Sequence, residues 1–280
     1  MHKILKVNQL AENVREYRIE GRKIIRNARP GQFVIVIVDE DGERLPFTIV
    51  DTDEADGSVT LLVQTVGYST MQLAAKAEGD YVADFVGPLG NATELGGAKH
   101  VLLVGGGIGT AVIYPQAKHL FAQGTRVDAV IGARNKSLVM YEDKFRSHTH
   151  NLYITTDDGS YGRKGFVTDA VNELLSAKES TIDLVFAVGP LAMMRAVCAV
   201  TKQFGIKTVV SMNSMMVDGT GMCGCCRLTV HGETRYACVD GPEFDGHGVD
   251  FEEAINRSKT YLNEEYDDKC RITGESCRAE

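Results

Sequence analysis

The sequence predicts a chain of mixed α/β and β class in three parts: an antiparallel β-barrel, a doubly wound parallel α/β domain, and a loop subdomain that ends in a helix. Three observations predict this. Short strand-like runs fill the first third, strands alternate with helices in the middle, and a Gly- and Cys-rich stretch then interrupts the alternation. We place the boundaries at residues 1–96, 97–212 and 213–280.

The first part is predicted from three runs rich in Val, Ile and Phe, at residues 32–38, 59–66 and 81–87. Gly, Asp and Pro bound each run, as they do in short antiparallel strands joined by turns. Several such strands in fewer than a hundred residues indicate a small barrel.

The middle part alternates regularly after His100. Each apolar run is followed by a segment with helical spacing, which is the pattern of a parallel sheet with right-handed crossovers. We expect strands at 101–106, 126–134, 152–159, 183–189 and 207–213, and helices at 110–124, 137–147, 167–177 and 192–205. The alternation stops at Asn213, and the tail over 249–268 reads as one amphipathic helix.

Bulk properties exclude some classes of partner. The 280 residues carry a net charge of −8, from 38 acidic and 30 basic side chains, so no electrostatic attraction to nucleic acid or membranes is expected. No apolar run approaches the roughly 20 residues of a spanning helix, and the first residues lack the pattern of a signal peptide. We therefore expect a cytoplasmic protein.

A glycine turn lies between the first strand and first helix of the α/β region. Glycines there permit a tight turn and a close approach of backbone amides to phosphate, and the helix N-terminus adds partial positive charge. The candidate nucleotide-binding residues of this turn are Gly105, Gly106, Gly107, Gly109 and Thr110. The alternative is a turn needed only for helix packing, but the strand–turn–helix context favours a nucleotide.

The second strand ends without the acidic residue of a dinucleotide-binding Rossmann unit. It ends instead near Arg134 and Lys136, which could hold an adenosine ribose or a 2′-phosphate, or could be solvated turn residues. The residues alone therefore leave NAD and NADP both open.

The most specific motif contains Asp218, Cys223, Cys226 and Cys238. A plant-type 2Fe–2S loop has the spacing Cys-x4-Cys-x2-Cys with a distant fourth Cys. Here Asp218 stands at the first ligand position, and its carboxylate keeps the single negative charge of a thiolate while being a harder ligand for ferric iron. The spacing therefore predicts a cluster held by these four side chains.

Two other readings of the cysteines are open. A structural zinc site would use the same thiolates, although such sites usually show paired short spacings. Reduced cysteines without a metal are the other alternative. The seven cysteines are odd in number and clustered, which argues against a disulfide framework. Cys225 is expected to point away from the cluster, and no role is assigned to Cys198, Cys270 and Cys277.

The stretches 211–227 and 236–245 carry a family resemblance. The chain resembles the small subunit of the NADH-dependent reduced ferredoxin:NADP oxidoreductase, known also as the beta subunit of sulfide dehydrogenase. More broadly it is similar to the ferredoxin–NADP reductase superfamily, which includes the electron-transfer subunit of dihydroorotate dehydrogenase. The latter relatives have Cys where this chain has Asp218, which favours the first branch.

The resemblance implies cofactors and sites. It gives the barrel FAD, with an Arg near the pyrophosphate and a hydroxyl near the isoalloxazine, and a second loop on the phosphate side. The flavin residues implied are Arg44, Pro46, Phe47, Thr48, Gly67, Ser69 and Thr70. It also implies NAD(H), with NADP(H) as the alternative. The further residues implied for the nucleotide are Arg134, Asp157, Asp158, Gly189, Pro190 and Met193. The alternative is that these residues form ordinary turns and helix caps.

The function implied is electron transfer between NAD(H), FAD and a 2Fe–2S cluster. Direct hydride transfer to flavin needs no side-chain acid or base, so no catalytic residue is expected. The resemblance implies a partner: a larger subunit of the glutamate-synthase-small-subunit type, with FAD and iron–sulfur clusters, that reacts with NADP and ferredoxin and bifurcates electrons. The alternatives are the electron-transfer subunit of dihydroorotate dehydrogenase and, from another class, a zinc-stabilised nucleotide-binding regulatory module.

Overall fold

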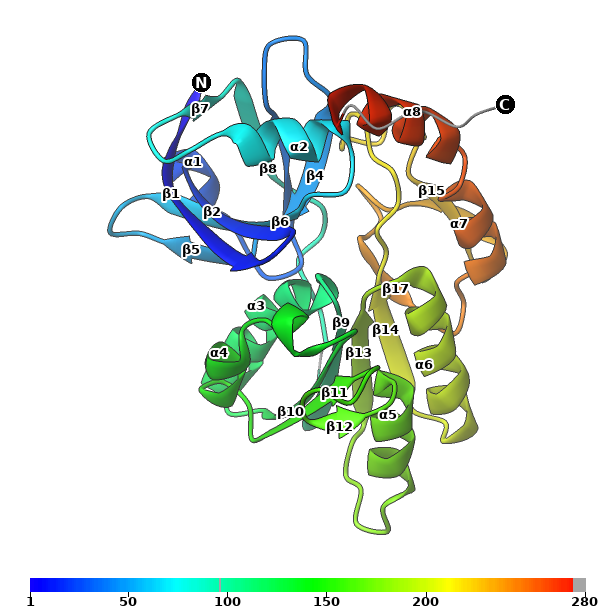
Figure 1. Ribbon diagram of the computed structural model, residues 1–280. Helices are drawn as coiled ribbons and strands as arrows, with labels where there is room; N and C mark the ends of the chain where they lie inside the picture. The colour runs from blue at the N-terminus through cyan, green and yellow to red at the C-terminus, as the bar shows by residue number, and fades with distance from the viewer. Residues whose placement is uncertain (96, 274–280) are drawn as a thin grey trace.

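The computed structural model describes residues 1–95 and 97–273. A β-rich half and an α/β half lie one above the other in Figure 1, and the C-terminal segment runs up beside them. Gly96, where the first predicted boundary falls, and residues 274–280, which include Cys277, lie outside the described residues. Within the described ranges, no helix is long and apolar enough to cross a membrane.

The first half is the predicted antiparallel barrel. Its two sheets have the strand orders β5-β6-β2-β1-β7 and β4-β3-β8, and every pair is antiparallel. Side chains from both sheets share one core, in which Ile4, Tyr17 and Val34 are fully buried. The elements are β1 (His2–Ala11), β2 (Val14–Glu20), α1 (Arg22–Ile25), β3 (Phe33–Ile37), β4 (Arg44–Thr48), β5 (Asp51–Asp53), β6 (Ser58–Gln64), α2 (Tyr68–Ala75), β7 (Tyr81–Val82) and β8 (Asp84–Leu89).

The second half is built on a seven-stranded sheet of order β12-β11-β10-β9-β13-β14-β17. All neighbours are parallel except the last pair, β14 and β17. The elements are β9 (His100–Gly106), α3 (Gly109–Ala122), β10 (Arg126–Ala133), η1 (Lys136–Leu138), α4 (Glu142–Arg146), β11 (Asn151–Thr156), β12 (Arg163–Lys164), α5 (Val167–Ser176), β13 (Leu184–Val188), α6 (Leu191–Gln203), β14 (Lys207–Ser211) and β17 (Glu243–Asp245).

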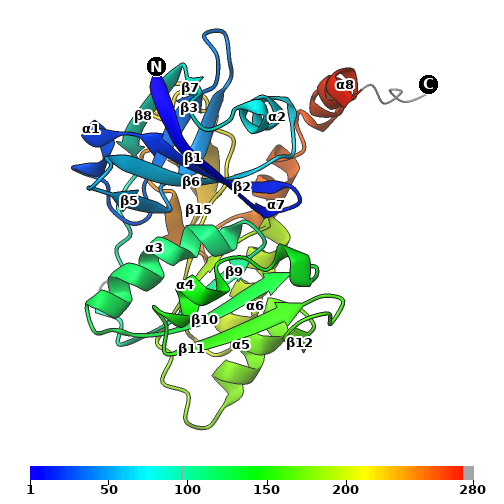
Figure 2. The same ribbon diagram turned by 60° about the vertical axis from the view of Figure 1, so that its left-hand side comes forward.

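Helices cover both faces of this sheet, as a doubly wound fold requires. Helices α3 and α4 contribute to a core that also contains Val14, Val50 and Leu62 of the barrel. Helices α5 and α6 pack in a separate core on the opposite face, and Figure 2 shows the two helix pairs on either side of the strands. The predicted fold class is confirmed.

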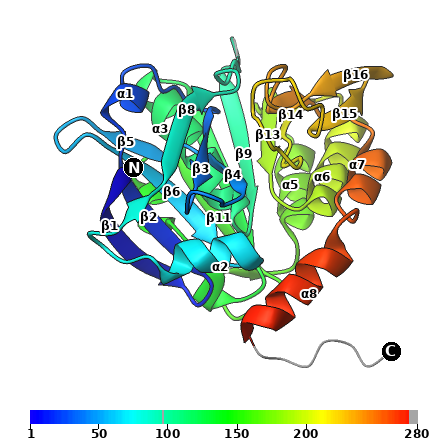
Figure 3. The same cartoon turned by 90° about the horizontal axis from the view of Figure 1, so that it is seen from above.

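The C-terminal segment shares the second of these cores. It contains the hairpin β15 (Arg227–Val230) and β16 (Glu233–Tyr236), strand β17 of the large sheet, and helices α7 (Phe251–Arg257) and α8 (Leu262–Thr273). Cys226, Leu228 and Phe251 are buried there with residues of α6. Helix α8 reaches back to α2 of the barrel, as seen from above in Figure 3.

Two expected helices differ from those observed. Residues 137–147 hold only the 3₁₀ turn η1 and the short helix α4, because Asn135 caps the backbone amide of Ser137 at 3.0 Å and Tyr141 adopts a left-handed φ of 60°. The Tyr141 hydroxyl donates to Glu16 of β2, so a contact between the two halves overrides helical spacing here.

The expected single helix over 249–268 is also wrong, since α7 and α8 are separated at residues 258–261. The hydroxyls of Ser258 and Thr260 donate to the carbonyls of Ile255 and Arg257, at 2.9 and 2.8 Å. Such side-chain to main-chain bonds compete with helix propagation, which explains why the helix ends there.

Candidate functional site

The glycine turn after β9 lies at the point where the strand order of the sheet reverses, between β9 and β13. Ligands of open α/β sheets bind outside the carboxyl ends of the strands at such a point. A Cβ atom on Gly109 would come within 2.3 Å of the carbonyl oxygen of Val188, so the start of α3 is pressed against the end of β13. Only glycine permits that approach.

The nucleotide-binding residues predicted after β13 lie beside this glycine turn. Cβ atoms on Gly106 and Gly189 would both meet the Met193 side chain, at 2.3 and 2.7 Å, and Pro190 lies beside Gly106. Helices α3 and α6, of 14 and 13 residues, therefore begin side by side at the same sheet edge. Their N-terminal amides suit a pyrophosphate, which is the physical fit of this edge to a dinucleotide.

Arg134, Asp157 and Asp158 follow the neighbouring strands β10 and β11 at the same edge and are exposed. The two loops are joined because the amides of Asp157 and Asp158 donate to the carbonyls of Ala133 and Arg134, at 3.1 and 3.2 Å. A hydrogen bond from Ser160 lowers the pKa of Asp158, so that carboxylate caps its own turn.

The implied flavin residues lie on β4 and at the start of α2. The Ser69 hydroxyl donates to Glu43, the residue before Arg44, and thereby fixes the first turn of α2 beside the start of β4. The Thr70 hydroxyl accepts from the amides of Val66 and Gly67, both at 3.0 Å. The two segments are thus adjacent, with exposed Arg44 next to the N-terminus of an eight-residue helix. A guanidinium and helix amides together suit a pyrophosphate.

Two of the four predicted metal ligands are brought together by the hairpin of β15 and β16. Pairing of Arg227 with Tyr236 places the residue before the first strand beside the residues after the second. The Sγ atoms of Cys226 and Cys238 consequently lie 3.3 Å apart and are buried, and burial raises the pKa of Cys238 to about 12. The eleven-residue gap in sequence is therefore closed by an ordinary hairpin.

The other two ligands lie in the loop before the hairpin. The carboxylate of Asp218 accepts from the amides of Thr220, Met222 and Cys223 at 2.8–3.0 Å, and the Thr220 bond contributes most to lowering its pKa. The loop coils because Gly219, Gly221 and Gly224 have φ between 68° and 86°, where other residues are strained.

The structure does not gather all four ligands into one set. No group of three or more His, Cys, Asp or Glu side chains is arranged around a metal position within residues 1–95 and 97–273. The donor types still fit an iron–sulfur cluster, since a close thiol pair, a further thiol in exposed Cys223 and an ionised carboxylate lie on one coiled loop and its hairpin.

The coiled loop packs directly against the barrel. A Cβ atom on Gly219 would lie 3.0 Å from Leu89 of β8 and 3.2 Å from Ile35 of β3. Ile35 is paired with Pro46 of the implied flavin segment. The predicted metal-binding loop and the predicted flavin strand are therefore joined through one intervening strand, which sequence separation did not reveal.

Sequence reasoning missed Glu243, a carboxyl at the junction of the barrel, α3 and β17. Its Oε1 accepts from the Thr93 hydroxyl at 2.6 Å, and Gln116 of α3 lies beside this pair. Burial raises the pKa of Glu243 to about 7. The available signal was an acid directly before Phe244, a residue type that is commonly buried.

The fold, the glycine turn at the sheet edge and the loop that carries the cysteines define a class of protein. It is an oxidoreductase subunit of the ferredoxin-reductase type. Two family models match. Residues 103–199 match an oxidoreductase NAD-binding domain, and residues 213–250 match the iron–sulfur cluster binding domain of dihydroorotate dehydrogenase B. The second match favours an iron–sulfur cluster over the zinc alternative.

Relatives extend over nearly the whole chain. A protein from Thermotoga maritima, described as a homolog of the electron transfer subunit of dihydroorotate dehydrogenase B (NAD(+)), is 43% identical over 99% of this chain and 98% of its own length. An uncharacterised protein from Clostridium beijerinckii is 47% identical over 95% of this chain and 92% of its own length. The chain belongs to the family of dihydroorotate dehydrogenase B-type electron transfer subunits and their homologues.

Solved structures agree with this assignment. A chain from the structure of the NADH-dependent reduced ferredoxin-NADP oxidoreductase, reported for flavin-based electron bifurcation, has a TM-score of 0.92, 43% identity and 98% coverage of both chains. The ferredoxin reductase of carbazole 1,9a-dioxygenase, at 18% identity, a TM-score of 0.61 and 73% and 64% coverage, shows the fold alone. The expected family and the expected cofactor types, FAD, an iron–sulfur cluster and NAD(H), are confirmed.

Proposed function

We propose that this chain moves electrons between NAD(H), FAD and a 2Fe–2S cluster, as one arm of a complex with a larger FAD and iron–sulfur subunit that reacts with NADP and ferredoxin and bifurcates electrons. One observation carries the proposal. The loop with Asp218 and Cys223 packs on Ile35, whose strand partner Pro46 belongs to the implied flavin segment. Electron transfer between two bound cofactors requires such proximity.

The chain's own groups take three tasks in this proposal. Arg44 and the start of α2 hold the flavin pyrophosphate, and the amides that open α3 and α6 orient the nicotinamide nucleotide over the barrel. Asp218, Cys223, Cys226 and Cys238 hold the irons. The bound cofactors supply the two-electron and one-electron chemistry, and no side chain needs to donate or accept a proton.

Further parts of the proposal follow from the same sites. Arg134 faces the adenosine end of the nucleotide and suits either a ribose or a 2′-phosphate, with NAD(H) preferred because the family's matching domain is NAD-binding. We assign residues 1–96 to FAD, 97–212 to NAD(H) and 213–280 to the cluster and the terminal helix. Thiol ligands require a reducing compartment, so we propose the cytoplasm.

The first test is the composition of the purified protein. We expect release of FAD on denaturation and two irons and two sulfides per chain. The Asp218→Ala protein should lose most of its iron, whereas Asp218→Cys should keep a cluster with an altered visible spectrum.

A matched variant separates a ligand from a loop cap. Asp218→Asn keeps an acceptor for the amides of Thr220 and Cys223 but removes the charged ligand. Loss of iron in Asp218→Asn supports coordination. A full iron content in both Asp218→Asn and Asp218→Ala would remove Asp218 from the ligand set, and one bound zinc would end the redox proposal.

The names of relatives favour a second candidate, the electron-transfer subunit of a dihydroorotate dehydrogenase. Asp218 speaks against it, because Cys is expected there in that branch. Affinity capture from the native host separates the two. A larger NADP-reactive flavoprotein in the captured complex supports the first candidate, and a dihydroorotate-oxidising flavoprotein supports the second.

A further inference from the structure

Two arginines, Arg227 and Arg257, lie beside the coiled loop that carries the predicted metal ligands. They line a cavity of about 240 Å³ between the end of β14, the loop and α7, and no Asp or Glu is among its lining residues. None of the ion pairs formed among the described residues involves Arg227 or Arg257. Guanidinium groups stay charged at all relevant pH values, so two positive charges lie here without an ion-pair partner in the part of the chain that the structure describes.

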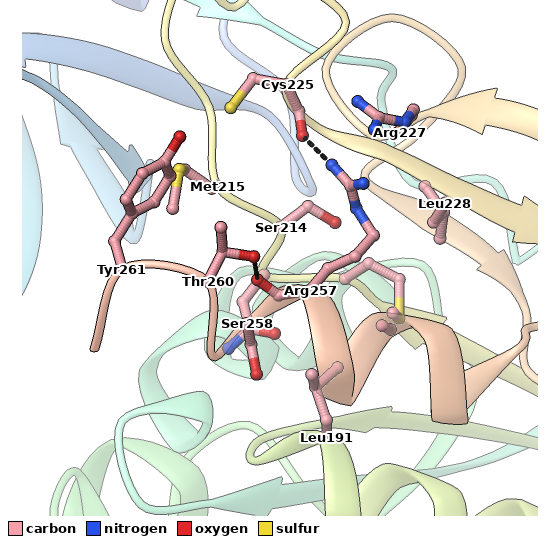
Figure 4. Close-up of a pocket in the computed structure, with 13 residues that line it drawn as sticks. Leu191, Ser214, Met215, Cys225, Arg227, Leu228, Arg257, Ser258, Thr260 and Tyr261 are labelled. Carbon is pink, nitrogen blue, oxygen red and sulfur yellow. Dashed lines mark hydrogen bonds between the residues drawn. The ribbon is translucent and has the colours of Figure 1, made fainter. Parts of the chain in front are cut away.

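Both side chains are directed at the backbone between two proposed ligands. Arg257 Nη2 donates to the carbonyl of Cys225 at 3.0 Å, and Arg227 Nη1 donates to the carbonyl of Gly224 at 3.4 Å. Figure 4 shows the Arg257 guanidinium reaching the Cys225 carbonyl, with Arg227 close to it. The peptide segment from Cys223 to Cys226 is therefore held from one side by cations.

Arg257 is itself held firmly, because α7 is attached to the hairpin. Glu253 Oε2 accepts from the amide of Thr229 at 3.0 Å, and the Asp250 side chain caps the amide of Glu253 at 2.9 Å. Phe251 at the start of α7 is buried. Half-buried Arg257, in the last turn, thus projects from a fixed helix rather than from a free surface.

We propose that Arg257, together with Arg227, is a positioning residue of the cluster that fixes its loop and raises its reduction potential. The inference rests on the proposed function. One electron entering a cluster bound by three thiolates and a carboxylate adds one negative charge to an already anionic group, and no bond needs to break. A nearby positive charge stabilises that reduced form through space. In its half-buried setting the Arg257 guanidinium is worth roughly a threefold to tenfold change in the ratio of reduced to oxidised cluster, and exposed Arg227 is worth less.

The test is an EPR-monitored redox titration of the cluster in the intact complex. Arg257→Gln should lower the reduced-to-oxidised ratio at fixed potential by roughly threefold to tenfold, where tenfold corresponds to 59 mV for one electron. Arg257→Lys keeps the charge and should stay near the wild type. Arg227→Gln should shift the ratio in the same direction. Arg235→Gln is the matched control, because it removes a like charge from an exposed position on β16 that does not line the cavity.

The outcomes separate this inference from the proposed function. Absence of iron and sulfide from the wild type would contradict the proposed function. A normal cluster whose potential is unchanged in both Arg257→Gln and Arg227→Gln, or moves equally in Arg235→Gln, would overturn the inference.

Two further results keep the inference testable. If Arg257→Gln loses its cluster on purification, Arg227→Gln still tests the charge effect. In a last experiment, the titration is repeated with added inorganic phosphate. A potential that responds to phosphate but to neither substitution would show that the cavity binds a free anion, and it would also overturn the inference.

Discussion

The seven-stranded sheet and the coiled loop that carries the predicted ligands Asp218 and Cys223 are held together by different means. Strands β9 and β13 are buried along their whole length, with Val101, Leu102, Leu103 and Phe186 fully shielded from water. The loop over 213–225 has no regular secondary structure, is held by hydrogen bonds to Asp218, and leaves Met222 88% exposed. The sheet is stabilised by apolar burial, whereas the loop has little core of its own.

This difference teaches which part of the molecule depends on its cofactor. A sheet with a complete core keeps its geometry without a ligand, and the same geometry forms the nucleotide-binding edge. A loop of glycines and free thiols gains stability chiefly when a metal joins its side chains. Three substitutions can break or sharpen this contrast.

The largest effect is expected from Cys238→Ser. Its Sγ atom is buried 3.3 Å from that of Cys226, so the serine would remove a thiolate from the close pair. We expect loss of the cluster, measured as iron and sulfide per chain, while NADH still reduces the flavin. The sheet should unfold at the wild-type temperature when the two apoproteins are compared.

Cys225→Ser is the matched control for that substitution. Cys225 lies in the loop before the hairpin, next to Cys226 of the close pair. It lines the cavity with Arg257, which is bound to its carbonyl oxygen. The cluster should therefore be retained in full. Iron loss in Cys225→Ser together with retention in Cys238→Ser would exchange the roles of the two residues.

The same contrast explains how far the sequence could predict the molecule. Apolar runs such as 101–106 and the glycine turn at Gly105 predict strand, turn and helix because buried periodicity is local information. The break at Tyr141 and the end of α7 near Ser258 depend on contacts with Glu16 and on hydroxyl bonds to the backbone, which periodicity does not encode.

The candidate site also has features that the local sequence predicts and features that depend on long-range contacts. Ligand spacing from Asp218 to Cys238 is readable in sequence, and so is the glycine cradle. The packing of Gly219 on Ile35, the approach of Arg257 to Cys225 and the hydrogen bond of Thr93 to Glu243 join residues far apart in the chain. Long-range contacts of this kind need the folded structure, since no local pattern marks either partner.

A smaller effect is expected from Gly109→Ala. It should impair NADH binding and leave the cluster intact, which is the reverse of the result expected for Cys238→Ser. The added Cβ would lie 2.3 Å from the Val188 carbonyl oxygen, so α3 and β13 must separate. Overpacking of this kind costs about 1–3 kcal/mol. We expect a raised KM for NADH in flavin reduction, with iron and sulfide content unchanged.

Gly124→Ala serves as the control at the other end of α3. Gly124 has a φ of 77° and no atom within 4 Å of an added Cβ, so alanine there strains the backbone without touching the edge. It should lower thermal stability and leave the KM for NADH unchanged. A KM that rises equally in both variants would mean that general destabilisation, and not the edge, sets NADH binding.

The smallest effect concerns the junction of the two regions, where Glu243 contacts Thr93 of the segment that follows the barrel. Burial raises its pKa from 4.5 to about 7, so the folded protein keeps a proton that the unfolded chain releases. This contribution to stability is fully present below about pH 4.5 and is lost as pH rises to about 7, with a slope of at most about 1.4 kcal/mol per pH unit.

Glu243→Gln should remove that slope and leave electron transfer unchanged, since the amide stays neutral at every pH. Urea unfolding of wild type and variant between pH 5 and 8 measures it, with exposed Glu233→Gln of β16 as a control that keeps the wild-type slope. Parallel pH profiles for wild type and Glu243→Gln would show that water reaches this junction and that the carboxyl is ionised there. The two regions would then be joined by a hydrated contact and not by a buried one.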